Sequence, residues 1–414
     1  MRGTLVIVLL AHASTARTDE ASIGWLVEQG ARPAAVVDSH EFEAVALSWT
    51  ASNAVNARVR VSQDGLQWSG WTALAIDGDS SESSEGRFVS AITHFGFAVR
   101  HVEYSFSGSV ERVTVTMFAP PARSRIVANS ITFGSASIRS RTDWSCPDGE
   151  DSRWTPAYTT VTHVVVHHTT GANSVPDWDA EVRNIWFLHT LTNGWGDIGY
   201  NFLIAPDGMI YEGRAGGQGA IGAHFSCRNS NTAGIALLGT YTSVSPTAAA
   251  LASLRRLLGE VITKNNIDPT AIVHHPSSGL DLPTILGHRD GNVPGATCTI
   301  TECPGDVVYS MLPTMRSDMA VCRPSIDVQP ASTFVRPGES ATLTVKARGA
   351  EPYTYQWYSG TTPIGGATDA ALTVSPGTTT TYRVQIANPC GSIDSSSATV
   401  SLAIAGRRRA AGRR

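Results

Sequence analysis

The chain has 414 residues, of which 42% are hydrophobic and 16% are charged, a composition typical of soluble globular domains with ample core material. Its formal net charge is −4, and the five arginines of the C-terminal tail "GRRRAAGRR" leave −9 for the rest of the chain. This balance excludes a nucleic-acid binder that works through a basic surface, and the length predicts two or three domains.

The first sixteen residues, "MRGTLVIVLLAHASTA", predict a signal peptide. One arginine precedes a short apolar run, and the small residues after it suit a signal-peptidase cut. The run is too short to span a bilayer, and we expect no membrane span elsewhere. The protein is therefore expected to be exported, either secreted or attached to the cell wall, with the periplasm as an alternative.

Residues 30–120 predict an all-β, sandwich-like module. Runs of β-branched and aromatic residues are separated by turn signals such as Asp64-Gly65. Trp68 and Trp71 favour core or turn packing over sugar binding. We interpret residues 121–139 as a linker.

Residues 140–322 alternate predicted strands and helices, which indicates an α/β domain built on a mixed sheet. "HVVVHHT" and "GIALLGTY" are candidates for buried strands. Asp177 is a predicted N-cap of a helix that ends before Gly194, and Ser245 with Pro246 opens a second helix with one apolar face. A third helix is expected to begin near Gly305.

Residues 324–404 contain short β-rich runs at regular spacing, which predicts an immunoglobulin-like β-sandwich. Trp357 suits the buried strand tryptophan of that fold, although no cysteines lie on the expected facing strands. Cys322 and Cys390 bracket the block instead, and we expect them to form a disulfide. The basic tail, residues 405–414, is expected to be solvated.

The central block also contains residues that could hold a metal. His167 and His168 end an apolar strand, so their side chains point to opposite faces and only one can enter a given site. His288 lies in "GHRD" and Cys303 in "TECPG". A His/His/Cys set leaves a fourth coordination position open, as in catalytic zinc sites. Each signal is weak alone, and the spacing is too long-range to form a compact metal motif.

The order of motifs in this block resembles the peptidoglycan recognition protein and zinc amidase family, which includes the phage lysozyme-like amidases. "VVVHHTTG", "GWGDIGYNFLI", "YEGR", "GAHF", "GHRD" and "TECPG" follow one another within residues 140–322. The resemblance implies an N-acetylmuramoyl-L-alanine amidase, which cuts the amide between the lactyl group of muramic acid and the first L-alanine of the stem peptide. Its partner would be peptidoglycan, and we expect a monomer.

The resemblance also assigns roles to single residues. It implies that His167, His288 and Cys303 bind Zn2+, and that Tyr200 assists the attacking water or holds the substrate carbonyl. It implies that Thr301 forms a hydrogen bond to the tetrahedral intermediate. The residues expected to line the muropeptide groove are His224, Asn229, Trp195 and Phe225.

A second function class remains open: a non-catalytic peptidoglycan-binding receptor or a wall-adhesion protein. Non-catalytic relatives typically lack the cysteine ligand, whereas this chain has Cys303. The flanking β modules are expected to tether or orient the amidase on the wall.

The remaining histidines of this block are expected to be structural or supporting residues. His168 is expected to pack behind its strand, and His189 either supports the site from the first helix or has no role in it. His274 and His275 lie outside every family motif, and we interpret them as loop residues.

Cys298 lies in the long insertion between "GHRD" and "CPG". In an exported protein it is expected to pair with Cys227, or alternatively with Cys146.

Overall fold

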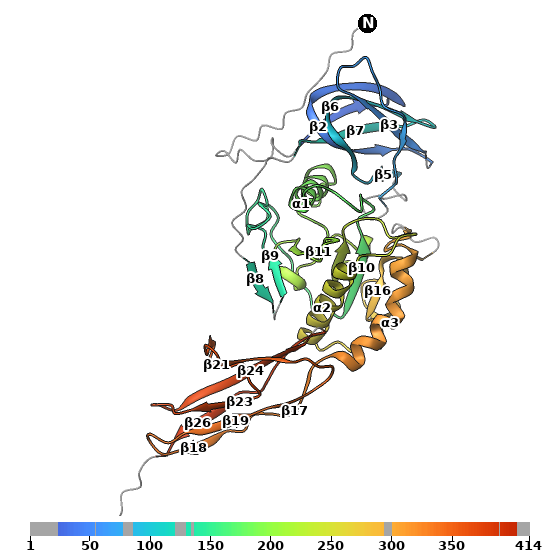
Figure 1. The fold of residues 1–414 in the computed structure, drawn as a ribbon. Coiled ribbons are helices and arrows are strands. Elements are labelled where there is room, and N and C mark those ends of the chain that lie inside the picture. Colours follow the sequence, from blue (N-terminus) through green and yellow to red (C-terminus); the bar gives the residue numbers. More distant parts are fainter. Residues whose placement is uncertain are drawn as a thin grey trace, which may run out of the picture. The chain divides into compact units, whose positions relative to one another are not determined.

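The computed structural model describes residues 24–53, 55–77, 86–120, 130–133, 136–293, 300–388 and 390–403 (Figure 1). The chain forms two compact units, Met1–Leu254 with Ile267–Arg316, and Arg255–Asn266 with Ser317–Arg414. The predicted signal peptide, the basic tail and Cys298 lie outside the described residues. Within these ranges, no helix combines the length and the apolar character needed to cross a bilayer.

The N-terminal block is a seven-stranded antiparallel sheet in the order β1-β7-β2-β6-β3-β4, with β5 paired to β2. Register shifts on both sides of Phe42 interrupt the pairing of the two longest strands, and such bulges bend a strand. The block is all-β as predicted, but its described strands belong to one continuous sheet and begin at Gly24, before the predicted boundary. The strands are β1 (Gly24–Gly30), β2 (Ala34–Thr50), β3 (Ala57–Ser62), β4 (Thr72–Ala73), β5 (Arg87–Val89), β6 (Thr93–Phe106) and β7 (Arg112–Phe118).

The central block contains the predicted mixed sheet, with strand order β16-β10-β13-β11-β12-β9-β8. Strand β10 pairs in parallel with both β13 and β16, whereas β11 and β12 are antiparallel. All six residues of β10 are buried, as its apolar sequence predicts for a strand covered on both faces. The strands are β8 (Ser130–Phe133), β9 (Ala136–Arg139), β10 (His163–His168), β11 (Phe202–Ile204), β12 (Ile210–Glu212), β13 (Thr232–Leu237) and β16 (Ile285–Gly287).

The interpretation of residues 121–139 as a linker is wrong for the second half of that segment. β9 pairs in parallel with β12, where Ile138 lies opposite Ile210, and β8 pairs antiparallel with β9. Each strand has only four residues, and the partner of β9 lies far along the chain. A local pattern therefore carries little signal for these two short strands.

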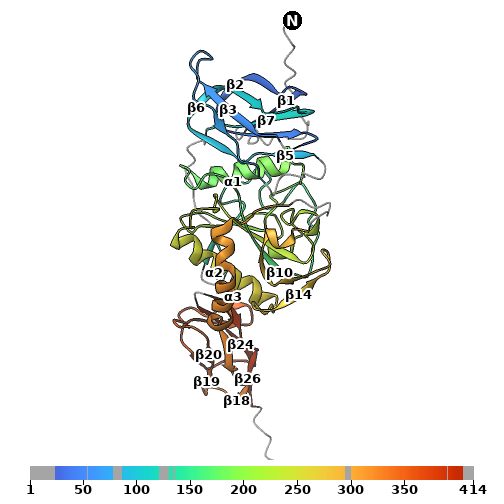
Figure 2. The same cartoon turned by 90° about the vertical axis from the view of Figure 1, so that its right-hand side faces the viewer.

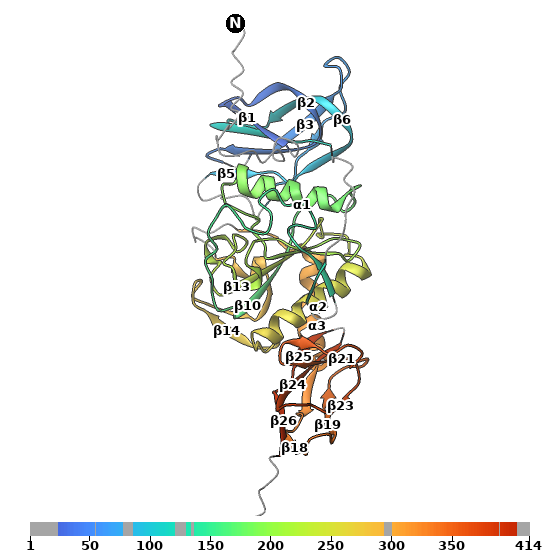
Figure 3. The ribbon, with the colours of Figure 1, turned by 90° about the vertical axis from the view of Figure 1, so that its left-hand side faces the viewer.

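The helices cover both sides of this sheet, with α1 on one side and α2 and α3 on the other (Figures 2 and 3). The Asp177 side chain accepts a hydrogen bond from Ala180 N (3.1 Å), which confirms the predicted N-cap of α1. Thr247, rather than Ser245, caps α2, because its hydroxyl accepts from Ala250 N at 3.1 Å. The helical elements are α1 (Trp178–Phe187), the π-helical turn η3 (Leu188–Thr192), the 3-10 turns η4 (Gly217–Gly219), η5 (Ser226–Arg228) and η6 (His288–Gly291), α2 (Ala248–Lys264) and α3 (Asp306–Cys322).

The interpretation of His274 and His275 as loop residues is wrong. They end β14 (Ile272–His275), which forms a hairpin with β15 (Leu280–Pro283). Strand alternation separates the two rings: His274 is exposed beside Asp281, whereas His275 is buried and lies 5.0 Å from the ring of His163.

Helix α1 shares one hydrophobic core with the N-terminal sheet and the central sheet. Phe118 of β7 lies 6.0 Å, ring to ring, from Phe187, and both belong to a cluster that also contains Ala236 of β13. His94 of β6 contacts Glu181 of α1 at 2.9 Å. Burial of the imidazole lowers the pKa of His94, but the negative charges of Glu181 and Glu43 raise it by more, so the net shift is upward. The N-terminal block is therefore packed on the central domain within the first unit.

The second unit contains the β-rich C-terminal block, and it confirms the predicted Cys322–Cys390 disulfide. Trp357 is fully buried in its core and donates a hydrogen bond to the carbonyl of Asp369 (2.8 Å). A six-stranded sheet and two strand pairs account for its described strands, and the immunoglobulin-like assignment remains a prediction. The strands are β17 (Ser325–Val328), β18 (Thr333–Val335), β19 (Ala341–Thr344), β20 (Lys346–Arg348), β21 (Thr354–Ser359), β22 (Thr362–Pro363), β23 (Ala371–Val374), β24 (Thr380–Asn388), β25 (Gly391–Asp394) and β26 (Ala398–Leu402).

Candidate metal centre

Two neighbouring parallel strands bring His167 and His288 together. Val166 of β10 lies opposite Gly287 of β16, so the next residues, His167 within β10 and His288 directly after β16, lie at the same end of the two strands. Their ring centroids are 4.9 Å apart. The carboxyl ends of parallel strands are the usual location of binding sites in α/β domains, and both histidines lie there.

Cys303 enters the same site from the loop that precedes α3. Arg289 N donates to the carbonyl of Cys303 (2.9 Å), which ties this loop to η6. The sulfur lies 3.5 Å from Nδ1 of His167, and the backbone N–H of His168 points at it from 3.4 Å. Such an N–H stabilises negative charge on sulfur, the form in which cysteine binds a metal.

The three side chains fit a zinc ion. Ligand atoms of His167, His288 and Cys303 all lie within 4.8 Å of one another, and each residue is at most 2% exposed. Two imidazole nitrogens and one thiolate sulfur suit zinc better than they suit harder cations such as magnesium or calcium, which prefer oxygen ligands. The structure thus brings together the three residues predicted as ligands.

Tyr200 lies beside this cluster, with its ring centroid 5.2 Å from that of His167. A buried ion pair holds the loop that carries it: Nη1 of Arg141 contacts Oδ1 of Asp197 at 3.0 Å, and both side chains are fully buried. The carboxylate of Asp197 also accepts from the backbone N–H groups of Ile198 (2.8 Å) and Ala215 (2.9 Å). The "GDIGY" motif therefore fixes the position of the tyrosine through its aspartate.

Thr301 is only 7% exposed, and its hydroxyl oxygen accepts a hydrogen bond from Cys303 N (3.0 Å). Its backbone pairs with the Asn292 side chain in both directions, at 2.8 Å and 3.1 Å. Thr301 consequently braces the turn that presents the cysteine. Its hydroxyl hydrogen can still donate, because accepting a hydrogen bond leaves the O–H in place.

The four residues predicted to line a groove do not form one exposed surface. His224 is 1% exposed, and its Nδ1 faces Nε2 of His167 at 3.0 Å. Phe225 is also 1% exposed and packs in a small core 5.6 Å, ring to ring, from His288. The side-chain oxygen of Asn229 accepts hydrogen bonds from the backbone N–H groups of His224 (2.8 Å) and Phe225 (2.7 Å). These three residues support the loop behind the metal cluster.

Trp195, the fourth predicted groove residue, is partly exposed and lies 4.7 Å, ring to ring, from His189. His189 is buried, accepts from Gly199 N at 3.1 Å and lies 5.6 Å from the ring of Tyr200. Of the two alternatives left open for His189, the structure favours support of the site. His168 is buried behind its strand, where its Nδ1 accepts from Tyr241 N at 3.2 Å.

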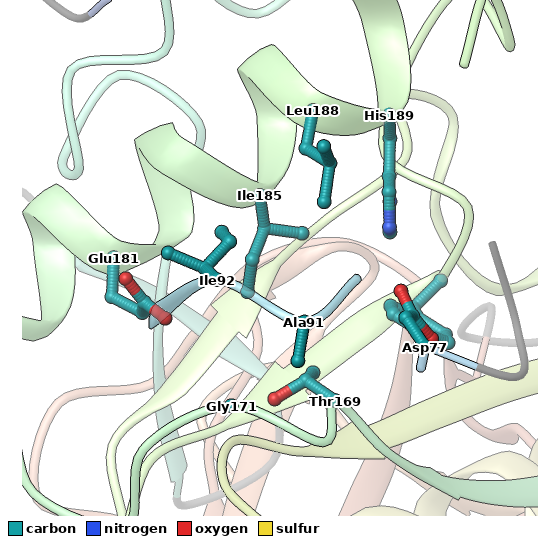
Figure 4. A pocket seen from close by; sticks show the side chains of 10 residues that line it. Asp77, Ala91, Ile92, Thr169, Gly171, Glu181, Ile185, Leu188 and His189 are labelled. Carbon is teal, nitrogen blue, oxygen red and sulfur yellow. The ribbon is translucent and has the colours of Figure 1, made fainter. Parts of the chain in front are cut away.

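A pocket reaches Tyr200 from the interface between α1 and the N-terminal block (Figure 4). It encloses about 300 Å³ of empty space, including the part that is open to solvent. Asp77, Ala91 and Ile92 of the N-terminal block form part of its wall, opposite side chains such as His189. Sequence reasoning missed these three residues, since their local sequence contains no motif and only tertiary packing places them beside the catalytic candidate.

Two further residues near the ligands were missed for the same reason. Ser226 Oγ lies 3.3 Å from Nε2 of His288, and Thr232 Oγ1 lies 3.3 Å from Nε2 of His224. Of the other cysteines, Cys227 is disulfide-bonded, whereas Cys146 is a free, buried thiol whose pKa burial raises to about 12.

Comparison with known proteins gives a family match over the same block. The family model described as N-acetylmuramoyl-L-alanine amidase matches residues 157–306. A human N-acetylmuramoyl-L-alanine amidase is 36% identical over 165 residues, which are 38% of this chain and 25% of the human protein. Peptidoglycan-recognition protein SC2 of Drosophila simulans is 30% identical over 179 residues, 43% of this chain and 85% of that protein. Peptidoglycan-recognition protein LB of Drosophila melanogaster is 32% identical over 180 residues, 42% of this chain and 67% of that protein.

The match thus spans a quarter of the human relative but most of the length of the insect relatives. Among solved structures, wild-type Drosophila PGRP-LB is 30% identical and covers 42% of this chain and 91% of its own, with a TM-score of 0.34. The motif order and the sequence identity over nearly a whole recognition protein lead to one assignment. The chain belongs to the family of peptidoglycan-recognition proteins and N-acetylmuramoyl-L-alanine amidases.

Proposed function

We propose that this protein is a zinc-dependent N-acetylmuramoyl-L-alanine amidase that hydrolyses the amide between the lactyl group of muramic acid and L-alanine in peptidoglycan. The observation that carries the proposal is the convergence of His167, His288 and Cys303 within 4.8 Å, with Tyr200 beside them. A receptor that only binds peptidoglycan does not need a buried thiol next to two imidazoles. Two relatives, from human and pig, carry the amidase name, which agrees with this choice.

In this proposal the chain's own side chains hold the metal and orient the substrate. His167, His288 and Cys303 would bind zinc, which supplies Lewis acidity toward the scissile carbonyl. The hydroxyl of Tyr200 would donate to the carbonyl oxygen or hold the attacking water, since its ring is fixed beside His167. Thr301 would keep Cys303 in place and offer its hydroxyl hydrogen to the developing oxyanion.

We place this activity outside the cytoplasm, with peptidoglycan as the partner. The Cys322–Cys390 disulfide supports an oxidising compartment, as does the predicted signal peptide at residues 1–16.

The test is product identification after incubation of the full-length protein with purified peptidoglycan. New N-terminal L-alanine and free lactyl carboxylates should appear, should vanish with a chelator and should return with added zinc. Cys303→Ser should remove the products, and Tyr200→Phe should lower kcat by about 10²–10³, the cost of losing one oxyanion donor. Cys146→Ser is the matched control, because this inert thiol lies outside the ligand cluster.

Binding of peptidoglycan by the wild-type protein without any cleavage would contradict the proposal and favour the receptor alternative. Full activity in Cys303→Ser would contradict the assigned ligand set.

A further inference from the structure

A chain of hydrogen bonds leads away from the metal cluster into the protein interior. Nε2 of His167 lies 3.0 Å from Nδ1 of His224, and Nε2 of His224 lies 3.3 Å from the hydroxyl of Thr232. That hydroxyl donates to the backbone carbonyl of Asn229 at 2.7 Å. His167, His224 and Thr232 are each at most 1% exposed, so bulk water does not compete for these bonds.

The end of this chain determines the direction of every bond in it. A backbone carbonyl can only accept, so the single hydroxyl hydrogen of Thr232 is used on Asn229. The hydroxyl oxygen must then accept from Nε2 of His224, which therefore carries the ring proton. With both imidazoles neutral, the form in which histidine binds a metal, Nδ1 of His224 is left as an acceptor and receives the hydrogen on Nε2 of His167. The remaining nitrogen of His167, Nδ1, keeps its lone pair, and it faces Cys303 Sγ.

The backbone holds the His224 ring in the position that this chain requires. A Cβ added at Gly222 would lie 2.4 Å from the imidazole, and one added at Gly234 would lie 2.5 Å from it, so only glycine fits on these two sides. The Asn229 side chain fixes the backbone of His224 by accepting from its N–H at 2.8 Å. The backbone of both glycines therefore packs directly against the imidazole and limits its movement.

We propose that His224, supported by Thr232, is a positioning residue that holds His167 in the Nε2-protonated tautomer and so presents Nδ1 to the metal. The imidazole-to-imidazole bond replaces the carboxylate or carbonyl that more often receives the second N–H of a metal-bound histidine. The inference rests on the proposed function only in taking zinc as the metal. It adds a role for His224 and Thr232 that differs from lining a groove.

Zinc affinity of a paired set of variants tests the role of the chain. Thr232→Val removes the hydroxyl at nearly constant volume, and Thr232→Ser keeps it. We expect Thr232→Val to weaken zinc binding about 10-fold and His224→Phe about 100-fold, the range found when such supporting groups are lost. Thr232→Ser should stay within about 3-fold of wild type. Affinity is measured by competition with a chromophoric chelator, and the thermal midpoint of each zinc-free variant reports folding.

The tautomer itself is measured on the zinc-free wild-type protein, without any variant. Nitrogen-15 NMR of the imidazole rings should show Nε2 of His167 protonated and Nδ1 unprotonated, with the signals assigned by their loss in His167→Asn. Thr232→Val should introduce the other tautomer.

A protonated Nδ1 in the folded wild type would overturn the proposal, as would unchanged zinc affinity in a folded Thr232→Val together with a folded His224→Phe. Neither measurement uses peptidoglycan. If the protein has no amidase activity, the proposed function is refuted, but the zinc affinities and the NMR spectra still decide this inference. If the wild type binds no zinc, the proposed function fails and the NMR result decides the tautomer.

Discussion

At the scale of single residues, the loop that carries Tyr200 depends on a buried ion pair. Arg141 and Asp197 are both 0% exposed, and the guanidinium also donates to the carbonyl of Gly149 at 3.0 Å. A buried pair of this kind contributes little relative to apolar residues, but removal of one partner leaves an uncompensated charge. The pair therefore matters most for the loop that carries Tyr200.

Asp197→Asn is expected to lower the free energy of unfolding by about 3–5 kcal/mol, since the guanidinium of Arg141 then stays buried without a counter-charge. Urea unfolding measures this loss. Arg141→Met alone should be similarly costly, and the double variant should lose clearly less than the sum of the two single losses. Additive losses would show that the two groups do not act as a pair.

At the scale of elements, helix α2 contains an acid in an unfavourable environment. Burial raises the pKa of Glu260 to about 7, although Arg256, one turn earlier with Nε 3.5 Å from the carboxylate, opposes the shift. The side chain is 11% exposed. The folded state therefore holds a proton that the unfolded chain releases near pH 4.3.

This difference predicts that Glu260 destabilises the fold increasingly as pH rises from about 4.3 to about 7, where the folded state binds more protons than the unfolded state. Below that range the cost is absent, and above it the cost is constant, at up to about 4 kcal/mol. Glu260→Gln should match the wild type in denaturant unfolding at pH 4.5 and exceed it at pH 8.

The matched control is Glu339→Gln, because Glu339 is 54% exposed and pairs with Arg336 at the surface. This variant reports how the loss of one surface carboxylate affects unfolding at the same two pH values. An equal effect of Glu260→Gln at both pH values would contradict the raised pKa.

At the scale of the whole molecule, the N-terminal block is packed into the first unit through a shared core. Its residues Ala91 and Ile92 belong to the wall of the pocket at Tyr200, and Phe118 belongs to the core shared with α1. This packing makes the block a structural part of the first unit, and its role in tethering or orienting that unit on the wall stays a prediction.

Phe118→Ala is expected to cost about 3–5 kcal/mol and to reduce the hydrogen-exchange protection of α1 as well as that of β2. The reason is that the ring packs against Phe187 of α1. Val59→Ala, in the separate core of the N-terminal sheet, is the matched control. When the two variants lose the same hydrogen-exchange protection in β2, Val59→Ala should lose less protection in α1 than Phe118→Ala does. Native protection of α1 in Phe118→Ala would show that the two blocks are independent.

Much of the fold and of the metal cluster could be predicted from the sequence, because their signals are local. The apolar run of β10, the cap at Asp177 and the ordered motifs around His167 and Cys303 are each contained in a few neighbouring residues. The Cys322–Cys390 disulfide followed from the position of the two cysteines at the ends of one block.

The sequence by itself determined the family and predicted the three residues of the metal cluster, since residue types and motif order suffice for these. Only the tertiary structure decided what surrounds them. It turned His224 toward His167, added β8 and β9 to the central sheet and placed Ile92 beside the pocket. The physical reason is that these features depend on contacts between segments far apart in the chain, which leave no periodic pattern in either segment.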